Sequence, residues 1–263
     1  MTQPDTPVTL HQAGPVLTIA LNRPELHNAM NPALIAGLTH AFAERAQAAG
    51  VRVVVLTGNG RSFCAGADLA AMRAAADYTF EENVADGGAI FDLMLAIDRC
   101  PRPVIGRVNG PAIGGGVGLV SCCDIVVAVE RAVFAFSEAR LGIVPAVISP
   151  FVLARIGPSA ARELFLTGER FDARRAQAIG LVGHVVAEAE LDTAVAERVE
   201  QLLQAAPGAQ ATAKDLIHTV AFQPKESLRE ITATTIAARR ASDEGREGMS
   251  AFLEKRKPWW QQS

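Results

Sequence analysis

Residues 103–123 read PVIGRVNGPAIGGGVGLVSCC, an apolar run followed by a glycine-rich loop and a second apolar segment. The run at 104–108 has the character of a strand that is buried on both faces, and the loop leads into a helix. Residues 53–72, VVVLTGNGRSFCAGADLAAM, have the same design. Because buried strands separated by helices pair in parallel through crossover connections, the two stretches predict an α/β fold with two glycine-rich strand-to-helix turns.

The remaining sequence divides into an α/β part and a helical part. From about residue 192 onward helical periodicity dominates and β-branched runs are absent. We therefore predict a core at 1–191 and a C-terminal helical region at 192–263 that serves packing and oligomerisation. Within the core, the patterns predict a strand at 16–21, a helix from Asn31-Pro32 to about residue 49, and strands at 51–56 and 125–129.

Composition excludes several classes of protein. The chain of 263 residues carries 25 Lys and Arg against 28 Asp and Glu, a net charge of −3, so no basic surface is expected for nucleic-acid phosphates. A hydrophobic content of 49% is too high for a disordered chain. The first ten residues lack the pattern of a secretory signal, and the longest uncharged run, 108–123, is too short to cross a membrane. We expect a cytoplasmic protein without nucleic-acid or membrane partners.

No metal site is expected, because the cysteines have neither CxxC spacing nor histidines at zinc-ligand spacing. The four cysteines are Cys64, Cys100, Cys122 and Cys123.

The two glycine-rich turns are candidates for an oxyanion hole. The first N–H groups of a helix have no partner within the helix, and neighbouring strands could direct two of them at one oxygen atom. The alternative is that these glycines only permit tight turns. Neither loop matches the GxxxxGK[ST] or GxGxxG patterns of phosphate-binding loops, and no GxSxG nucleophile motif is present.

Six motifs, spread over nearly the whole chain, resemble the successive signatures of the enoyl-CoA hydratase/isomerase, or crotonase, family. The combination GGxxGLxSCCD and SExRxGxxPAxISPF, the latter at 137–151, is similar to bacterial methylglutaconyl-CoA hydratases. The six motifs are LNRPELHNAM (21–30), LTGNGRSFCAGADL (56–69), VNGPAIGGGVGLVSCCDI (108–125), FSEARLGIVP (136–145), LTGERFDARRAQAIGLV (166–182) and EGMSAFLEKRKP (247–258).

The resemblance implies a crotonase-like (ClpP/crotonase) spiral of repeated ββα units, with C-terminal helices that pack homotrimers or homohexamers. It also implies an acyl-CoA thioester as substrate and no separate cofactor or metal. The thioester carbonyl would accept hydrogen bonds from the Ala65 and Gly115 N–H groups. Substrate contacts are expected from Leu26, His27, Ala65, Gly66, Ala67, Asp68, Gly115 and Gly118, and from Phe252 and Lys255 of a neighbouring subunit.

One departure from the family pattern concerns the reaction. Typical hydratases have two catalytic glutamates, and the second is present here as Glu138, whereas Gly118 stands in the place of the first. Hydration needs an activated water and a proton delivered to the α-carbon. Glu138 would act as acid and base in a hydratase, which we favour. A Δ3,Δ2-enoyl-CoA isomerase that uses Glu138 alone and a non-catalytic acyl-CoA-binding or scaffold protein remain the alternatives.

Other polar residues have simpler interpretations. Cys64 is more readily a small core residue than a nucleophile, since no histidine partner is identifiable. Asp68 would either contact coenzyme A or cap the following helix. Arg140 would bind a second substrate carboxylate, or it would lie at the surface or at a subunit contact, which is the favoured interpretation. Glu81 and Glu82 are weaker candidates for the missing carboxylate.

Overall fold

The computed structural model describes residues 6–262, which contain two sheets. Residues 1–5, part of the segment in which no secretory signal was expected, lie outside them. In the larger sheet, the strands separated by helices pair in parallel, as predicted, whereas the first strand, which the sequence patterns did not identify, pairs antiparallel with the second. Its order is β1 (Val8–Ala13), β2 (Val16–Leu21), β3 (Val53–Gly58), β4 (Val104–Val108), β6 (Ile125–Val129) and β9 (His184–Val186).

A smaller sheet lies beside the large one. Two single-pair bridges, Cys64 with Ala112 and Met30 with Ala67, extend its edge towards the glycine-rich loop at 64–67. The chain thus runs from a strand of the large sheet through a strand of the small sheet to a helix, as β4, β5 and α4 do, which is the ββα repeat that the resemblance implied. The small sheet has the order β5 (Ala112–Ile113), β7 (Val133–Ala135) and β8 (Arg170–Asp172).

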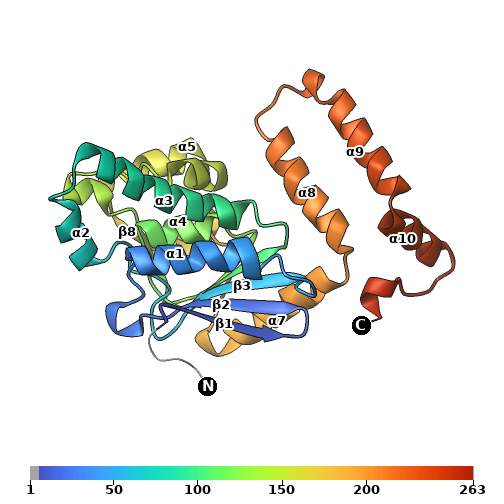
Figure 1. Cartoon of the computed structure of the whole chain (residues 1–263), viewed down its shortest axis with the longest axis horizontal. Helices are drawn as coiled ribbons and strands as arrows, with labels where there is room; N and C mark the ends of the chain where they lie inside the picture. Colours follow the sequence, from blue (N-terminus) through green and yellow to red (C-terminus); the bar gives the residue numbers. More distant parts are fainter. Residues whose placement is uncertain (1–5, 263) are drawn as a thin grey trace.

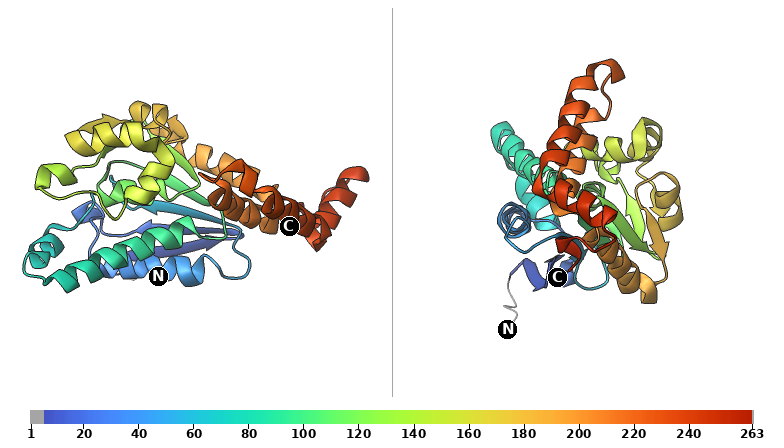
Figure 2. Two further views of the ribbon diagram at one scale, coloured as in Figure 1. Left: turned by 90° about the horizontal axis from the view of Figure 1, so that it is seen from above. Right: turned by 90° about the vertical axis from the view of Figure 1, so that its right-hand side faces the viewer.

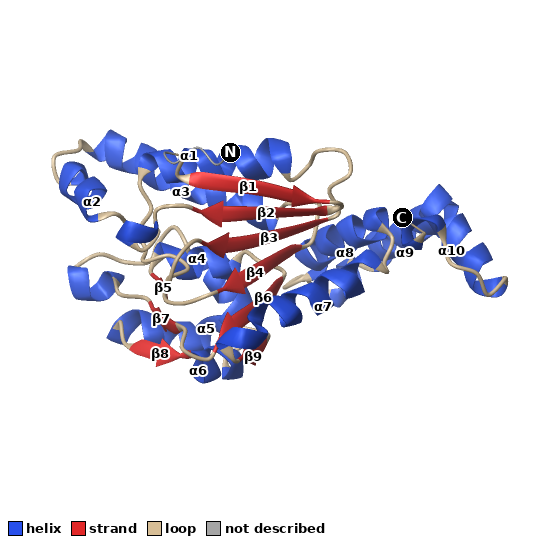
Figure 3. Cartoon of the chain, turned by 90° about the horizontal axis from the view of Figure 1, so that it is seen from below, coloured by secondary structure: helices blue, strands red, loops and turns tan. Residues whose placement is uncertain are grey.

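Helices cover both faces of the large sheet (Figures 1 and 3). Along β2, Leu17 and Ile19 are buried beneath the first helices, while Thr18 faces the groove beside α7 (Leu191–Leu203), as expected from the two-residue period of a strand. On the first face lie α1 (Pro32–His40), a π-helical turn (Ala41–Arg45), α3 (Phe80–Asp98) and α4 (Gly115–Ser121); α2 (Leu69–Ala75), α5 (Ser149–Thr167) and α6 (Ala173–Ala178) complete the core.

The predicted elements agree with the structure apart from small shifts at their ends. Strands at 16–21, 104–108 and 125–129 have the predicted bounds, and β3 begins and ends two residues later than the predicted 51–56. The apolar residues of β3, 53–56, are buried as predicted, and its last two residues, Thr57 and Gly58, are buried as well. The helix from Pro32 ends its α-helical part at His40 and continues as the π-helical turn to Arg45, short of residue 49.

The predicted C-terminal region is helical, and no strand follows β9 among residues 6–262. The first helix, α7, packs against the large sheet, and its Asp192 forms an ion pair of 2.7 Å with Arg107 of β4. The next three helices form an arm that extends from one end of the body (Figure 2). They are α8 (Pro207–Val220), α9 (Arg229–Ala241) and α10 (Asp243–Leu253). Among the described residues, no helix combines the length and apolar character needed to cross a bilayer.

Candidate active site

The two glycine-rich turns lie against each other, as predicted. The Ile113 N–H donates to the Cys64 carbonyl at 3.0 Å. A Cβ atom on Gly66 would come within 2.7 Å of the Ile113 carbonyl oxygen and 3.8 Å of the Gly115 nitrogen, and one on Gly116 would overlap the Cys64 carbonyl. Gly66 also has a φ of +88°, which disfavours any side chain. Glycine is therefore required for the first turn of α4 to approach the loop.

Hydrogen bonding distinguishes the N–H groups of these turns and corrects one prediction. The Ala65 N–H donates to the His27 carbonyl at 2.9 Å, so it is occupied. The Ala67 N–H, two residues further on, has no acceptor among residues 6–262, and the same holds for Gly115, the first residue of α4. The structure therefore supports Gly115 and Ala67 as free donors, and argues against Ala65.

Glu138 begins a 3-10 turn (Glu138–Leu141) that follows β7, and its side chain reaches the start of α4. A Cβ atom on Gly114, which has a φ of +52°, would lie 3.0 Å from Glu138 Oε1. The other oxygen, Oε2, is buried and has no hydrogen-bond partner within the described chain. Burial raises the pKa of the Glu138 carboxyl, an effect that the residue's own N–H partly offsets. A carboxyl with a raised pKa and a free oxygen is suited to proton transfer.

Leu26 and His27 lie next to the 65–68 loop through the Ala65–His27 hydrogen bond. Leu26 is 47% exposed, and His27 Nδ1 lies 2.9 Å from the Ser62 hydroxyl. The Arg61 guanidinium lies 3.2 Å from His27 Nε2 and provides a cation at this end of the site. Arg61 was not among the predicted substrate contacts, because only the fold brings it to His27.

Asp68 caps helix α2, as one of its two interpretations predicted. Its carboxylate accepts hydrogen bonds from the Ala70 and Ala71 N–H groups at 2.8 and 3.2 Å, and forms an ion pair with Arg23 at 2.9 Å. The Ala71 N–H, followed by Arg23 and the Ala70 N–H, lowers the pKa of Asp68 against the effect of burial. All these contacts are made within the chain, so a structural role accounts for the residue.

We expect Asp68→Ala to lower the free energy of unfolding by about 1–2 kcal/mol, because it removes the cap and the carboxylate partner of Arg23. Asp68→Asn retains a capping oxygen and should lose less. Since the pKa of Asp68 is lowered on folding, its contribution is present above its ordinary value of 3.8 and is lost as the pH falls through the folded value. Urea unfolding from pH 2 to 7 measures this, and equal stability of all three proteins would contradict it.

The remaining candidate residues take no part in the proposed proton transfer or oxyanion binding. Burial raises the pKa of the Cys64 thiol to about 12, which excludes a thiolate nucleophile. Arg140 packs over Gly168, and its Nε donates to the Thr167 carbonyl at 3.0 Å. Glu82 caps helix α3 in a capping box with Thr79. Among residues 6–262, no group of three His, Cys, Asp or Glu side chains is placed to hold a metal ion.

Phe252 and Lys255 lie at the end of the arm. Phe252, in the last turn of α10, is 84% exposed, and Lys255 follows that helix. Figure 1 shows this end of the chain well apart from α2 and α4. The structure does not bring these two residues to the Glu138 site of the same subunit, and their contact with a neighbouring subunit's coenzyme stays a prediction.

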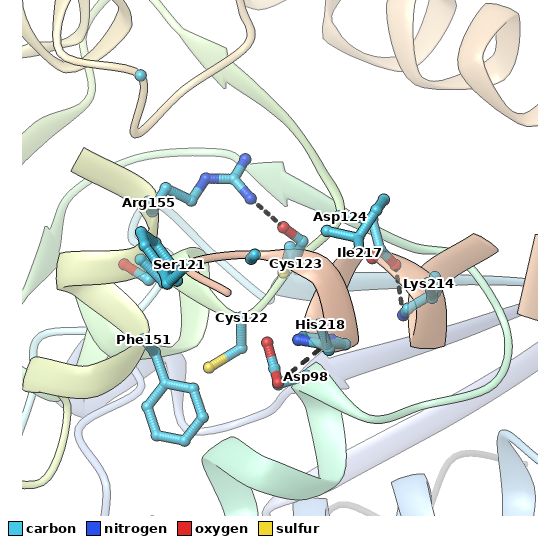
Figure 4. Close-up of a pocket in the computed structure, with 14 residues that line it drawn as sticks. Asp98, Ser121, Cys122, Cys123, Asp124, Phe151, Arg155, Lys214, Ile217 and His218 are labelled. Carbon is cyan, nitrogen blue, oxygen red and sulfur yellow. Dashed lines mark hydrogen bonds and ion pairs between the residues drawn. The ribbon is translucent and has the colours of Figure 1, made fainter. Parts of the chain in front are cut away.

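A cavity of about 640 Å³ lies at the C-terminal end of α4, where α8 packs against the core (Figure 4). Its charged side chains are paired within the chain. Lys214 Nζ lies 2.7 Å from Asp124, His218 Nε2 lies 3.5 Å from Asp98, and Arg155 donates to the Cys123 carbonyl. These contacts attach the arm to the core, and they give Asp124 a structural role.

Comparisons with known proteins place the chain among acyl-CoA enzymes. The sequence profile of the enoyl-CoA hydratase/isomerase family matches residues 11–263. A carnitinyl-CoA dehydratase of Salmonella paratyphi A is 35% identical over 257 residues, which are 95% of this chain and 97% of that protein. An enoyl-CoA hydratase of Alternaria alternata is 36% identical over 252 residues, covering 94% and 81% respectively.

The expected crotonase-like fold is confirmed by solved structures. That of an enoyl-CoA hydratase from Shewanella pealeana superposes with a TM-score of 0.94 at 36% identity, covering 99% of this chain and 100% of the other.

Proposed function

Because the chain belongs to the enoyl-CoA hydratase/isomerase family and is an enzyme of that family, we propose that it adds water across, or removes water to form, the 2,3 double bond of an acyl-CoA thioester. One observation carries this proposal. The buried Glu138 carboxyl, with an unpartnered oxygen, lies beside the turn whose Gly115 N–H also lacks an acceptor. A proton-transfer group and an oxyanion donor therefore adjoin each other.

The two free N–H groups stabilise the charge that develops during the reaction. When water attacks the β-carbon of the conjugated thioester, the electron pair of the double bond moves towards the carbonyl and forms an enolate oxygen. The Ala67 and Gly115 N–H groups donate to that oxygen. Backbone donors that are held in place before the reaction need no rearrangement in the transition state, and each is worth a substantial part of the rate enhancement.

Glu138 carries the single proton that hydration requires. As a carboxylate it removes a proton from the attacking water, and as the resulting acid it delivers that proton to the α-carbon. The charge balance is kept, because the negative charge passes from the carboxylate to the enolate and then returns. A pKa raised by burial makes the carboxylate a stronger base for the first step.

A second candidate reaction is Δ3,Δ2-enoyl-CoA isomerisation. One base would remove the α-proton and return it to the γ-carbon, with no water involved. The observation that favours it is the hydrocarbon around Gly118, where Ile148 and Met94 take the space of any second catalytic side chain. For the acyl group we propose a branched chain of the methylglutaconyl type, on the resemblance of residues 137–151.

The test is to add the purified protein to crotonyl-CoA and methylglutaconyl-CoA and to follow the conjugated enoyl absorbance. Loss of absorbance supports hydration. Gain of absorbance from a 3-enoyl-CoA, with neither conjugated substrate consumed, supports the isomerase. Acyl-CoA binding without turnover of any of these compounds would support the alternative of a non-catalytic acyl-CoA-binding or scaffold protein. Synthesis of the 3-hydroxyacyl product, identified by mass, separates hydration from hydrolysis of the thioester.

The arm supports the proposal of a homotrimer or a homohexamer. No residue of α8 or α9 is buried, and large apolar side chains lie exposed along the arm, including Ile217, Phe222, Ile236 and Phe252. Exposed apolar surface of this kind marks an interaction site. Sedimentation equilibrium distinguishes the two assemblies from a monomer, and a monomer at micromolar concentration would contradict both.

A further inference from the structure

Two hydrocarbon side chains from distant parts of the sequence occupy the space beside Gly118. Gly118 lies within α4 and is buried. A Cβ atom there would overlap the Cγ2 methyl of Ile148, and would lie 3.0 Å from both Ile148 Cβ and Met94 Cε. Carbon atoms that are not bonded do not approach so closely in a packed core. Any side chain at this position therefore requires one of the two neighbours to move.

Both neighbours are held in the core. Met94, on α3, is fully buried, and its sulfur lies 3.7 Å from the Cys122 Sγ, which donates to it. Ile148 is 3% exposed and directly precedes α5, and the Val152 N–H donates to its carbonyl at 3.0 Å. A β-branched side chain has few rotamers with which to avoid a clash. The contact is thus fixed from three helices, α3, α4 and α5.

This contact lies one helical turn from the residue that borders the proton-transfer carboxyl. The Gly118 N–H bonds to the Gly114 carbonyl at 3.2 Å, one helical turn away, and Gly114 is the residue that borders Glu138 Oε1. The segment leading to Ile148 is tied to the same carboxyl-bearing turn, because the Ile143 N–H donates to the Glu138 carbonyl at 3.2 Å. Burial is the main cause of the raised pKa of Glu138, and no neighbouring charge contributes to it.

We propose that Ile148 and Met94 are specificity-determining residues that exclude a second acid/base side chain from the active site, and that Gly118 is the residue their packing requires. The inference rests on the proposed function, in which Glu138 alone carries the proton. It follows that the three positions 94, 118 and 148 together exclude a second acid/base side chain. Changing Gly118 alone does not give a two-carboxylate site, whereas shortening Ile148 first opens the space for one.

Thermal unfolding tests the packing without any turnover. Alanine forms helices better than glycine, so a loss of stability on Gly118→Ala reports the clash. We expect the Tm to fall by about 4 °C or more in the native background, and to fall by clearly less when the same change is made on Ile148→Ala, which removes the overlapping Cγ2 methyl group but keeps the Cβ atom. Gly88→Ala, in the interior of α3, is the control, because nothing lies within 4 Å of the added methyl group. An equal loss in both backgrounds, or none in either, overturns the proposal.

The second measurement is the pH dependence of kcat/KM for crotonyl-CoA hydration in Gly118→Glu, Ile148→Ala and the double variant. We expect a second ionisation only in the double variant, together with a Tm above that of Gly118→Glu alone. A double variant with one ionisation overturns the proposal, as does a stable Gly118→Glu protein with two. If the native protein turns over no enoyl-CoA, the proposed function fails, while the thermal comparison still decides what fills the space at Gly118.

Discussion

Glu138→Gln is expected to lower kcat for enoyl-CoA hydration by about 10²- to 10⁴-fold, the range found when a positioned acid/base group is removed. The amide has nearly the shape of the carboxyl but neither accepts the water proton nor returns it to the α-carbon. Steady-state kinetics with crotonyl-CoA measure the loss. Glu81→Gln is the matched control, because Glu81 lies exposed in the first turn of α3 and should retain native activity. A less than threefold loss in Glu138→Gln would remove Glu138 from its proposed role.

The same pair of proteins should show a pH-dependent difference in stability. Burial raises the pKa of Glu138 in the folded protein above its ordinary value of 4.5. Between the two pKa values the folded state binds more protons than the unfolded state, so the contribution of Glu138 to stability falls as the pH rises. Glu138→Gln lacks this titration. Its Tm minus that of the native protein should therefore increase from pH 4.5 upward, until the folded-state pKa is passed, whereas Glu81→Gln should show no such trend.

The parts of the fold that the sequence predicts best are those determined by local pattern. The β-branched run at 125–129 and the alternation at 16–21 define strands with the predicted bounds, because burial on one or both faces decides these patterns. The helix from Asn31 is also predicted at its start, where the Asn31 side chain accepts from the Leu34 N–H. Its end is not, since the π-helical turn at Ala41–Arg45 has no local signal in the sequence.

The site shows why motif spacing alone could not select the free donor. Ala65 and Ala67 both lie in the CAGAD motif, and both are followed by a small or polar residue. Which N–H remains free depends on how the loop pairs with residues 27–30, since the His27 carbonyl accepts from Ala65 and Met30 forms an isolated bridge with Ala67. The contact of Gly118 is likewise non-local, because Met94 and Ile148 lie 24 and 30 residues away from it in the sequence.

Gly115→Pro removes one backbone donor and places the proline Cδ where the amide hydrogen was. Gly115 is the first residue of α4, and proline is tolerated there because its missing N–H has no partner within the helix. Proline also disfavours an α-helical conformation in the residue before it, and Gly114, with φ +52° and ψ −120°, is outside that region. The substitution thus removes the proposed donor while it leaves the helix able to form.

Gly115→Ala is the control, because it adds a Cβ in the same place and keeps the N–H. In both variants the added carbon displaces the flexible terminal methyl group of Met30. We expect kcat for Gly115→Pro to lie about 10²- to 10³-fold below that of Gly115→Ala, the cost of one oxyanion donor, with Tm values that differ little. Equal activity in two equally stable variants would show that the Gly115 N–H does not bind the thioester oxygen. A loss confined to KM would instead assign that N–H to substrate binding, since an interaction made equally in the ground state and the transition state leaves kcat unchanged.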